Sequence, residues 1–248
     1  MPRNPARIRP PSAETLALAG LWAGFADLAA AGLLLALAVD GWAPAQDLPW
    51  KPLSLNDPVG LATGVKFARA AADPLRCRAV LRQGGVSFSD APDREPGGCS
   101  IANAVRLRDG VAIPLSPPAP EITCPLALSY AFWTKHVVQP AAGAELGGRV
   151  VSIEHYGAFA CRNIYGRARA PRSEHASANA IDVAGFRLAD GRRVTVAGDF
   201  HRSDARGRFV RRAREGACDW FHAVLSPDYN AAHRDHLHLD FGAYRACR

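Results

Sequence analysis

The pattern of hydrophobic and polar positions changes twice along the chain. From 15 to 39 nearly every residue is apolar, with Asp27 as the main interruption. Residues 40–60 show little periodicity and contain four prolines, whereas helical and strand-like spacings follow beyond residue 60. The pattern predicts an N-terminal segment at 1–45, a proline-rich linker at 46–59 that holds the domain away from a membrane, and a folded domain at 60–248.

Within the domain, the spacing of apolar residues predicts both helices and strands. We expect helices over 61–72, 125–138 and 209–225, the second of them ended by Pro140. We expect short strands and loops over 77–109, a proline-rich loop at 114–120, strands at 149–153 and 236–241, and a hairpin of 180–188 with 192–197. Because helices mix with hairpins and no strand–helix unit repeats, the fold class is predicted as α+β, a small antiparallel sheet flanked by helices.

Composition narrows the class of protein. The 248 residues are 48% hydrophobic and 21% charged, which suits a globular domain and excludes a disordered chain. The formal net charge is +7, but the arginines are mostly scattered and no nucleic-acid-binding motif accompanies them. The charge is therefore compatible with an anionic partner, and we expect no nucleic acid and no obligate protein partner.

The N-terminal segment predicts export. Three arginines precede the apolar stretch and two aspartates follow it, which places the remainder outside the cytoplasm: Arg3, Arg7, Arg9, Asp40 and Asp47. Twenty-five residues can span a bilayer as an anchor. Alternatively, 28–39 is the core of a signal peptide cleaved after the small residues at 43–45, or the segment is a helix buried in the domain. We expect a periplasmic protein, held at the inner membrane by this segment or released after cleavage.

The cysteines agree with export. Six cysteines are present, no two in a CxxC pair, so an oxidising compartment should join them in up to three disulfides. Six cysteines allow 15 pairings, and spacing alone does not choose among them. The pairing adopted as a working prediction is Cys77 with Cys99, Cys124 with Cys161, and Cys218 with Cys247.

Two short segments, 173–182 and 233–240, hold a dense set of metal-ligand side chains. His175 and Asp182 can share a metal only if the chain doubles back between them, which the small and polar residues there permit. Strand alternation places His236, His238 and Asp240 on one face. His175, Asp182 and His238 would then bind zinc with a fourth position open to water, and Asp235 would accept a proton from that water. A single histidine is more often structural, so the prediction depends on both segments occurring together.

At these residues the chain resembles the extensin-like C-terminal domain family, over about 57–247. That family looks related to the LAS zinc peptidases, which include D-alanyl-D-alanine carboxypeptidases, murein endopeptidases and the hedgehog signalling domain. The LAS pattern is SxHxxGxAxD, followed by a carboxylate three residues before a histidine. The matching residues are Ser173, His175, Ala180, Asp182, Asp235, His236 and His238. Two departures are Ala178 in place of glycine and Asp235 in place of the commoner glutamate.

The resemblance implies roles for individual residues. His175, Asp182 and His238 would bind Zn²⁺, Asp235 would be the general base, and His236 would assist near the oxyanion. Arg162 and Ser173 are the candidate substrate-binding residues, although Arg162 is equally well explained as structural.

The implied function is a zinc-dependent peptidase on peptidoglycan peptides in the cell envelope, with zinc-activated water attacking a peptide carbonyl. The alternatives are a non-catalytic zinc-containing envelope or peptidoglycan-binding module, and a zinc-free envelope scaffold.

Overall fold

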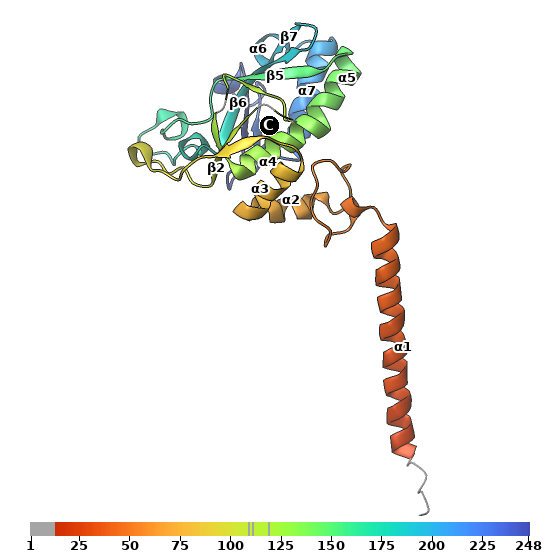
Figure 1. The fold of residues 1–248 in the computed structure, drawn as a ribbon. Helices are drawn as coiled ribbons and strands as arrows, with labels where there is room; N and C mark the ends of the chain where they lie inside the picture. Colours follow the sequence, from red (N-terminus) through yellow and green to blue (C-terminus); the bar gives the residue numbers. More distant parts are fainter. Residues whose placement is uncertain (1–12, 109, 111, 119) are drawn as a thin grey trace, which may run out of the picture.

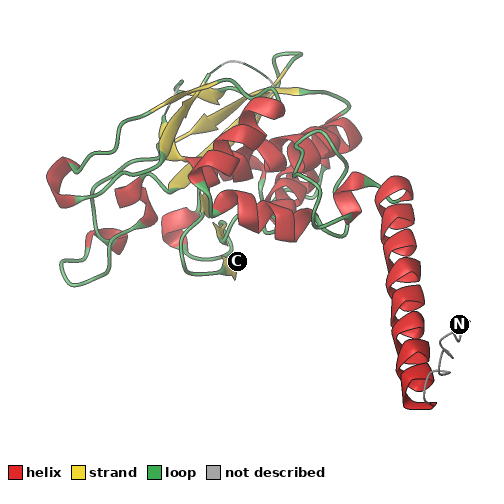
Figure 2. Ribbon diagram, turned by 60° about the horizontal axis from the view of Figure 1, so that its bottom comes forward, coloured by secondary structure: helices red, strands yellow, loops and turns green. Residues whose placement is uncertain are grey.

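The N-terminal helix stands apart from the rest of the molecule. The computed structural model describes residues 13–108, 110, 112–118 and 120–248. Helix α1 (Ala13–Trp42) extends away from the other elements as a single rod, and apolar side chains such as Trp22 and Leu28 are exposed on it (Figures 1 and 2). Across the described part of the chain, no helix combines the length and the apolar character needed to cross a membrane. The arginines used to orient the segment, Arg3, Arg7 and Arg9, lie outside the described residues.

A seven-stranded sheet forms the centre of the domain. Its strand order is β10-β8-β9-β6-β5-β3, and β7 pairs with β6 as the predicted hairpin. The inner strands pair antiparallel as predicted, but the outer pairs β3–β5 and β10–β8 are parallel, so the sheet is mixed. Its strands are β3 (Leu115–Ser116), β5 (Val150–His155), β6 (Ala180–Leu188), β7 (Arg193–Thr195), β8 (Ala223–Leu225), β9 (Leu237–Asp240) and β10 (Ala246–Cys247).

A second sheet and six helices complete the described part of the domain. A small antiparallel sheet joins β1 (Phe88–Asp90), β2 (Ala104–Leu107) and β4 (Glu121–Thr123). Figure 1 shows α4, α5 and α7 together beside the large sheet, with α2 and α3 below them. The helices are α2 (Thr63–Ala71), α3 (Pro74–Gln83), α4 (Cys124–Trp133), α5 (Gln139–Leu146), α6 (Val196–Asp199) and α7 (Ala205–Ala217). The core between helices and sheet contains the fully buried Trp133, Phe186 and Phe209, and the predicted α+β class is confirmed.

The prediction of strands over 77–109 is wrong in its first part, where α3 forms. The Asp73 side chain accepts hydrogen bonds from the backbone N–H groups of Leu75 and Arg76, and Pro74 occupies the first turn. Cys77 and Leu81 then lie four residues apart on one buried helix face. The Asp-Pro pair was the sequence signal for this helix start.

The expectation that Pro140 ends a helix is also wrong. A wider π-helical turn (Thr134–Val138) follows α4, and α5 continues beyond it with Pro140 in its first turn. A proline lacks the N–H of a normal helical hydrogen bond and clashes with the carbonyl four residues earlier. The π turn, in which the Gln139 N–H donates to the Thr134 carbonyl five residues back, removes this conflict.

The helix predicted at 209–225 begins and ends earlier than expected. The side chain of Asp204 accepts from the N–H groups of Arg206 and Gly207, which starts α7 at Ala205. The helix ends at Ala217, and residues expected in its last turns form β8 instead. The apolar residues of β8 continue the apolar spacing of the helix, which explains why the sequence predicts one longer helix.

The segment 46–59, expected as a linker, packs on the domain. Leu53 and Leu55 are buried in the main core, and the Lys66 ammonium group of α2 donates to the Ala45 and Pro52 carbonyls. These contacts bring the end of α1 close to the folded domain instead of holding it at a distance.

Three disulfides join the six cysteines. The predicted pair Cys218–Cys247 is confirmed, whereas the other two predicted pairs are wrong. Cys77 of α3 bonds to Cys124 at the start of α4, because these two helices pack together in the core. Cys99 bonds to Cys161, which joins two loops far apart in the sequence. Three disulfides indicate an extracytoplasmic protein.

Candidate metal centre

The local fold of the chain between His175 and Asp182 brings these two side chains together. A short 3₁₀ helix (Glu174–Ser177) presents His175, and the Ser173 hydroxyl accepts a hydrogen bond from the His175 N–H. Ala178 follows in the left-handed region at φ 55°, where the chain reverses into β6. Glycine, which the SxHxxGxAxD pattern has at this position, adopts the left-handed conformation at lower cost than alanine does.

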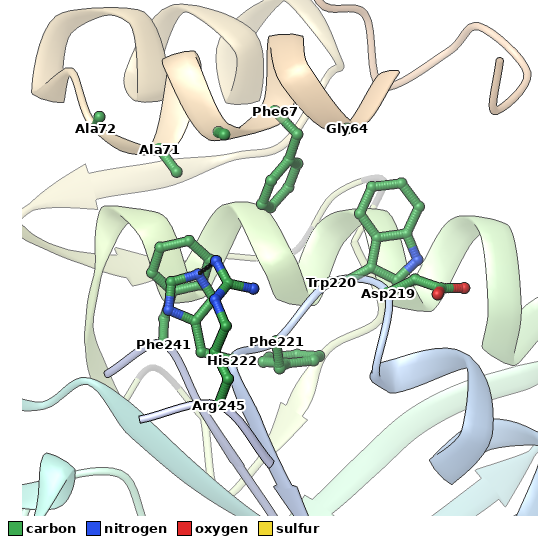
Figure 3. Close-up of a pocket in the computed structure, with 11 residues that line it drawn as sticks. Gly64, Phe67, Ala71, Ala72, Asp219, Trp220, Phe221, His222, Phe241 and Arg245 are labelled. Carbon is green, nitrogen blue, oxygen red and sulfur yellow. Dashed lines mark hydrogen bonds between the residues drawn. The ribbon is translucent and has the colours of Figure 1, made fainter. Parts of the chain in front are cut away.

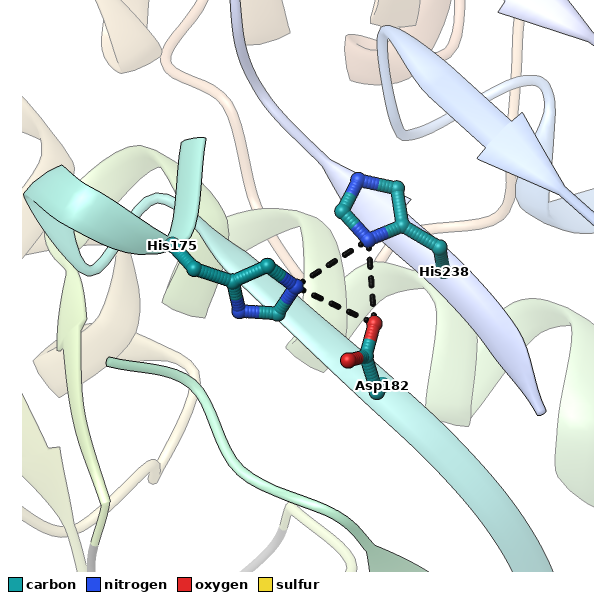
Figure 4. Close-up of side chains that lie close together, drawn as sticks. All are labelled: His175, Asp182 and His238. Carbon is teal, nitrogen blue, oxygen red and sulfur yellow. Dashed lines mark hydrogen bonds and ion pairs between the residues drawn. The ribbon is translucent and has the colours of Figure 1, made fainter. Parts of the chain in front are cut away.

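The sheet register supplies the third side chain. Asp182 of β6 is directly opposite His238 of β9 in an antiparallel pair, and their side chains meet (Figure 4). The His238 Nδ1 lies 2.9 Å from Asp182 Oδ1, and the His175 Nε2 lies 3.2 Å from each of these two atoms. All three side chains are largely buried. A ligand atom from each residue thus converges on one point, as the sequence predicted.

Hydrogen bonds on the far side of each ring decide which nitrogen faces this point. The His175 Nδ1 lies 3.0 Å from the Ala158 carbonyl oxygen, which only accepts, so Nδ1 carries the proton. The His238 Nε2 lies 3.0 Å from Asp240 Oδ2, and Asp240 Oδ1 accepts from the Gly242 N–H. Both remaining ring nitrogens therefore turn lone pairs toward the carboxylate of Asp182 and toward each other.

Such an arrangement needs a cation at its centre. Two lone pairs and a carboxylate oxygen repel one another at 2.9–3.2 Å unless a proton or a metal ion lies between them. Tetrahedral zinc with bonds of 2.0–2.1 Å would separate its ligand atoms by about 3.3 Å, close to these distances. The residues present therefore fit a metal ion, held by two imidazoles and one carboxylate.

The pKa values of Asp182 and His238 also indicate that positive charge is stabilised at this centre. Burial would raise the pKa of Asp182, but hydrogen bonds from His175 and His238 hold it far below its ordinary value. Burial would lower the pKa of His238, but Asp182 and Asp240 raise it to about 9. A proton thus occupies the centre in the absence of metal, and metal binding would release it.

Of the two residues predicted to take part in catalysis, His236 lines the cavity and Asp235 does not. His236 lines the cavity next to the metal group, and its Nε2 lies 3.6 Å from Asp182 Oδ1. Asp235 does not line this cavity, and its carboxylate accepts a hydrogen bond at 2.9 Å from the His236 Nδ1–H on the other side of the ring. Asp235 is therefore connected to the metal group through His236.

The cavity beside the metal group has a volume of about 340 Å³. Arg162 and Ser173, the candidate substrate-binding residues, both line it. Sequence reasoning missed most of its other walls, which come from loops and 3₁₀ turns: Ile164, Tyr165, Arg172, Tyr229, Ala232, His233 and Tyr244. These residues follow no periodic pattern, so only the folded chain identifies them.

Two further residues of the cavity, His233 and Asp240, have no role predicted from the sequence. Burial, together with the nearby His238 and His236, lowers the pKa of His233 to about 4, so this ring is neutral at pH 7. Asp240 is the hydrogen-bond partner of His238. The available signal was the strand spacing, because a residue two positions after a strand ligand lies on the same face.

Comparison with known proteins identifies the family of this chain. The family model described as Extensin-like protein C-terminus matches residues 75–248, which is most of the chain. The chain belongs to this family. No curated protein and no solved structure matches it.

Proposed function

We propose that this protein is a zinc-dependent peptidase that acts on peptidoglycan peptides in the cell envelope. The observation that carries the proposal is the geometry of His175, Asp182 and His238, whose three ligand atoms converge beside an open cavity. Catalytic zinc sites use three protein ligands and leave a position free, whereas structural sites use four. The set of two histidines and one carboxylate is one of the donor sets such sites use.

Zinc in this set would supply a Lewis acid that polarises a carbonyl group and lowers the pKa of a water molecule toward about 7. The chain's own residues complete the site. Asp240 and the Ala158 carbonyl hold the two imidazoles in the tautomers that keep their ligand nitrogens free. The side chains of His175, Asp182 and His238 are largely buried, which strengthens the charge interactions among them.

Proton transfer is assigned to Asp235 and His236 acting as a pair. His236 presents Nε2 toward the metal group and can take up a proton there as a general base. Asp235 orients the ring through Nδ1 and stabilises the imidazolium that forms. The same pair would then return the proton to the leaving amine. The shorter aspartate at position 235 thus acts through the neighbouring imidazole.

The substrate class follows from the cavity and the compartment. Arg162 and Arg172 line the cavity, and neither has an ion-pair partner among the described residues. Their charges favour a substrate that carries carboxylates, as peptidoglycan stem peptides do. The three disulfides indicate export. The periplasm is the proposed location, with the segment 1–45 as a membrane anchor or as a cleaved export signal.

The test is hydrolysis of purified muropeptides by the full-length oxidised protein. We expect cleavage that disappears with a chelator and returns with zinc. Asp235→Ala and His236→Ala should each lower the rate at least about 100-fold while zinc stays bound, because general base catalysis contributes that much. Asp228→Ala, an exposed carboxylate outside the cavity, is the matched control. Full activity in Asp235→Ala would remove Asp235 from this role.

A non-catalytic zinc-containing envelope module is the second candidate. The observation in its favour is the position of Asp235, which lies outside the cavity and already bonds to His236. One zinc per chain, binding of muropeptides and no cleavage would support this candidate against the peptidase. A folded protein that takes up no zinc would exclude both and leave the zinc-free scaffold.

A further inference from the structure

A second cavity of about 430 Å³ lies between α2 and the chain segments that precede β8 and follow β9 (Figure 3). It shares no lining residue with the cavity at the metal centre. Nothing in the proposed function uses it.

The walls of this second cavity are aromatic. Phe67 points from α2 into the cavity, toward the side chains of the segments that precede β8 and follow β9 (Figure 3). Its ring centroid lies 5.4 Å from that of Trp220 and 6.2 Å from that of Phe241. Ala68, next to Phe67 in the chain, and Ala71, one turn further along α2, leave space that larger side chains would fill. Aromatic walls of this kind favour a flat or branched apolar group.

The guanidinium group of Arg245 is held at the cavity by hydrogen bonding through His222. The His222 ring stacks on Phe241 with centroids 3.9 Å apart, and its Nδ1–H donates to the Gly242 carbonyl at 2.5 Å. Its Nε2 is therefore an acceptor, and it accepts a hydrogen bond of 2.9 Å from the Arg245 guanidinium. The network uses one N–H group of the guanidinium and directs the side chain over the cavity wall.

The charge of Arg245 is not neutralised within the described part of the chain, where no carboxylate lies within ion-pair distance of it. Asp219 is the single acidic residue among those that line the cavity, and its carboxylate points away from the guanidinium (Figure 3). A guanidinium with free N–H groups beside an apolar cavity is complementary to a carboxylate, which it binds through two parallel hydrogen bonds.

We propose that this cavity binds a monocarboxylate with an aromatic body, whose ring packs against the aromatic wall formed by Phe67, Trp220 and Phe241 and whose carboxylate pairs with Arg245. The C-terminal residue of an aromatic peptide and a free aromatic acid share this chemistry. The proposal rests on this cavity alone and does not depend on zinc or on peptidase activity.

The test is isothermal titration calorimetry of the full-length oxidised protein with N-acetylphenylalanine, with 3-phenylpropanoate and with N-acetylphenylalanine amide. We expect the carboxylates to bind and the uncharged amide to bind at least about tenfold more weakly. Tighter binding of N-acetylphenylalanine than of 3-phenylpropanoate identifies a peptide C-terminus as the source. The reverse order identifies a free aromatic acid. Binding that persists in His175→Ala belongs to this cavity and not to the metal centre.

Variants locate the binding site. Arg245→Gln should weaken carboxylate binding about tenfold or more, whereas Arg248→Gln removes the same charge nearby and should leave it unchanged. Ala68→Phe fills the cavity from an exposed helix position, so it should abolish binding without lowering the melting temperature. Absence of binding by every carboxylate, or equal affinity in the wild type and Arg245→Gln, would overturn the proposal.

Discussion

The hydrogen bond between His238 and Asp240 gives the sharpest test of the metal centre. Asp240 is buried and accepts two hydrogen bonds, at 3.0 Å from His238 Nε2–H and at 2.9 Å from the Gly242 N–H. In Asp240→Asn the side chain has one oxygen and one NH₂ group, so it can accept only one of the two. If its NH₂ group faces His238, the ring proton moves to Nδ1, and the nitrogen assigned to the metal loses its lone pair.

The expected cost follows from the role of such outer partners. Loss of a carboxylate that orients a metal-binding histidine typically weakens metal affinity 10–100-fold, which corresponds to about 1.4–2.7 kcal/mol. We therefore expect the zinc dissociation constant of Asp240→Asn to rise by this factor. Competition with a chromophoric chelator at pH 7 measures it, and Asp228→Asn, which changes an exposed carboxylate, is the matched control.

Two measurements distinguish an effect on the metal site from an effect on the stability of the fold. If the metal-free variant melts like the metal-free wild type, then a weaker zinc affinity reports on His238 alone. An unchanged zinc affinity in a folded Asp240→Asn protein would refute the claim that the Asp240 carboxylate is needed to hold the His238 proton on Nε2. The hydrogen bond from His238 to the Asp240 carboxylate would then make no contribution to zinc binding.

The remaining predictions concern other parts of the molecule. Elemental analysis should find about one zinc per chain in the wild type and none in His238→Ala, and equal zinc in both proteins would contradict the site. The double variant Cys99→Ser/Cys161→Ser removes a disulfide across 62 residues and should lose about 4 kcal/mol of stability to chemical denaturation; a loss below about 1 kcal/mol would show that the loops hold together without it. Burial lowers the pKa of His136 from its ordinary 6.5, although the Leu55 carbonyl acts in the other direction. The unfolded chain therefore takes up this proton first as the pH falls below 6.5, so the free energy of unfolding drops with acid, and His136→Phe should flatten that slope.

Much of the metal centre could be predicted from the sequence, because the positions of its ligands depend on residues close to them in the chain. Strand alternation around His238 and the small residues between His175 and Asp182 were readable from the chain, and they predicted three side chains that the structure brings together. The α+β class followed in the same way from the mixture of helical and alternating patterns. The hairpin was predicted from its Asp190-Gly191 turn, and in the structure Gly191 adopts the positive φ of 85° that glycine permits.

Other features were misread although a local signal existed. The start of α3 at Pro74 and that of α7 at Ala205 each have an aspartate cap directly before them. Apolar residues alone placed these helices wrongly, because a short apolar run suits a strand or a buried helix equally well. The helix can continue past Pro140 only because a π turn precedes it, and the spacing of apolar residues does not predict such a turn.

Only the tertiary structure decided which distant segments meet. Cys99 and Cys161 are 62 residues apart, and spacing contains no information on which loops will lie within disulfide reach. The same holds for the buried Leu55 in a proline-rich segment and for the carbonyl of Ala158 that sets the tautomer of His175. The sequence by itself determined the chemical groups and their local spacing, because these depend on neighbours along the chain. The pairing of disulfides, the cavity walls and the direction of each lone pair depend on packing between distant segments, which only the folded chain specifies.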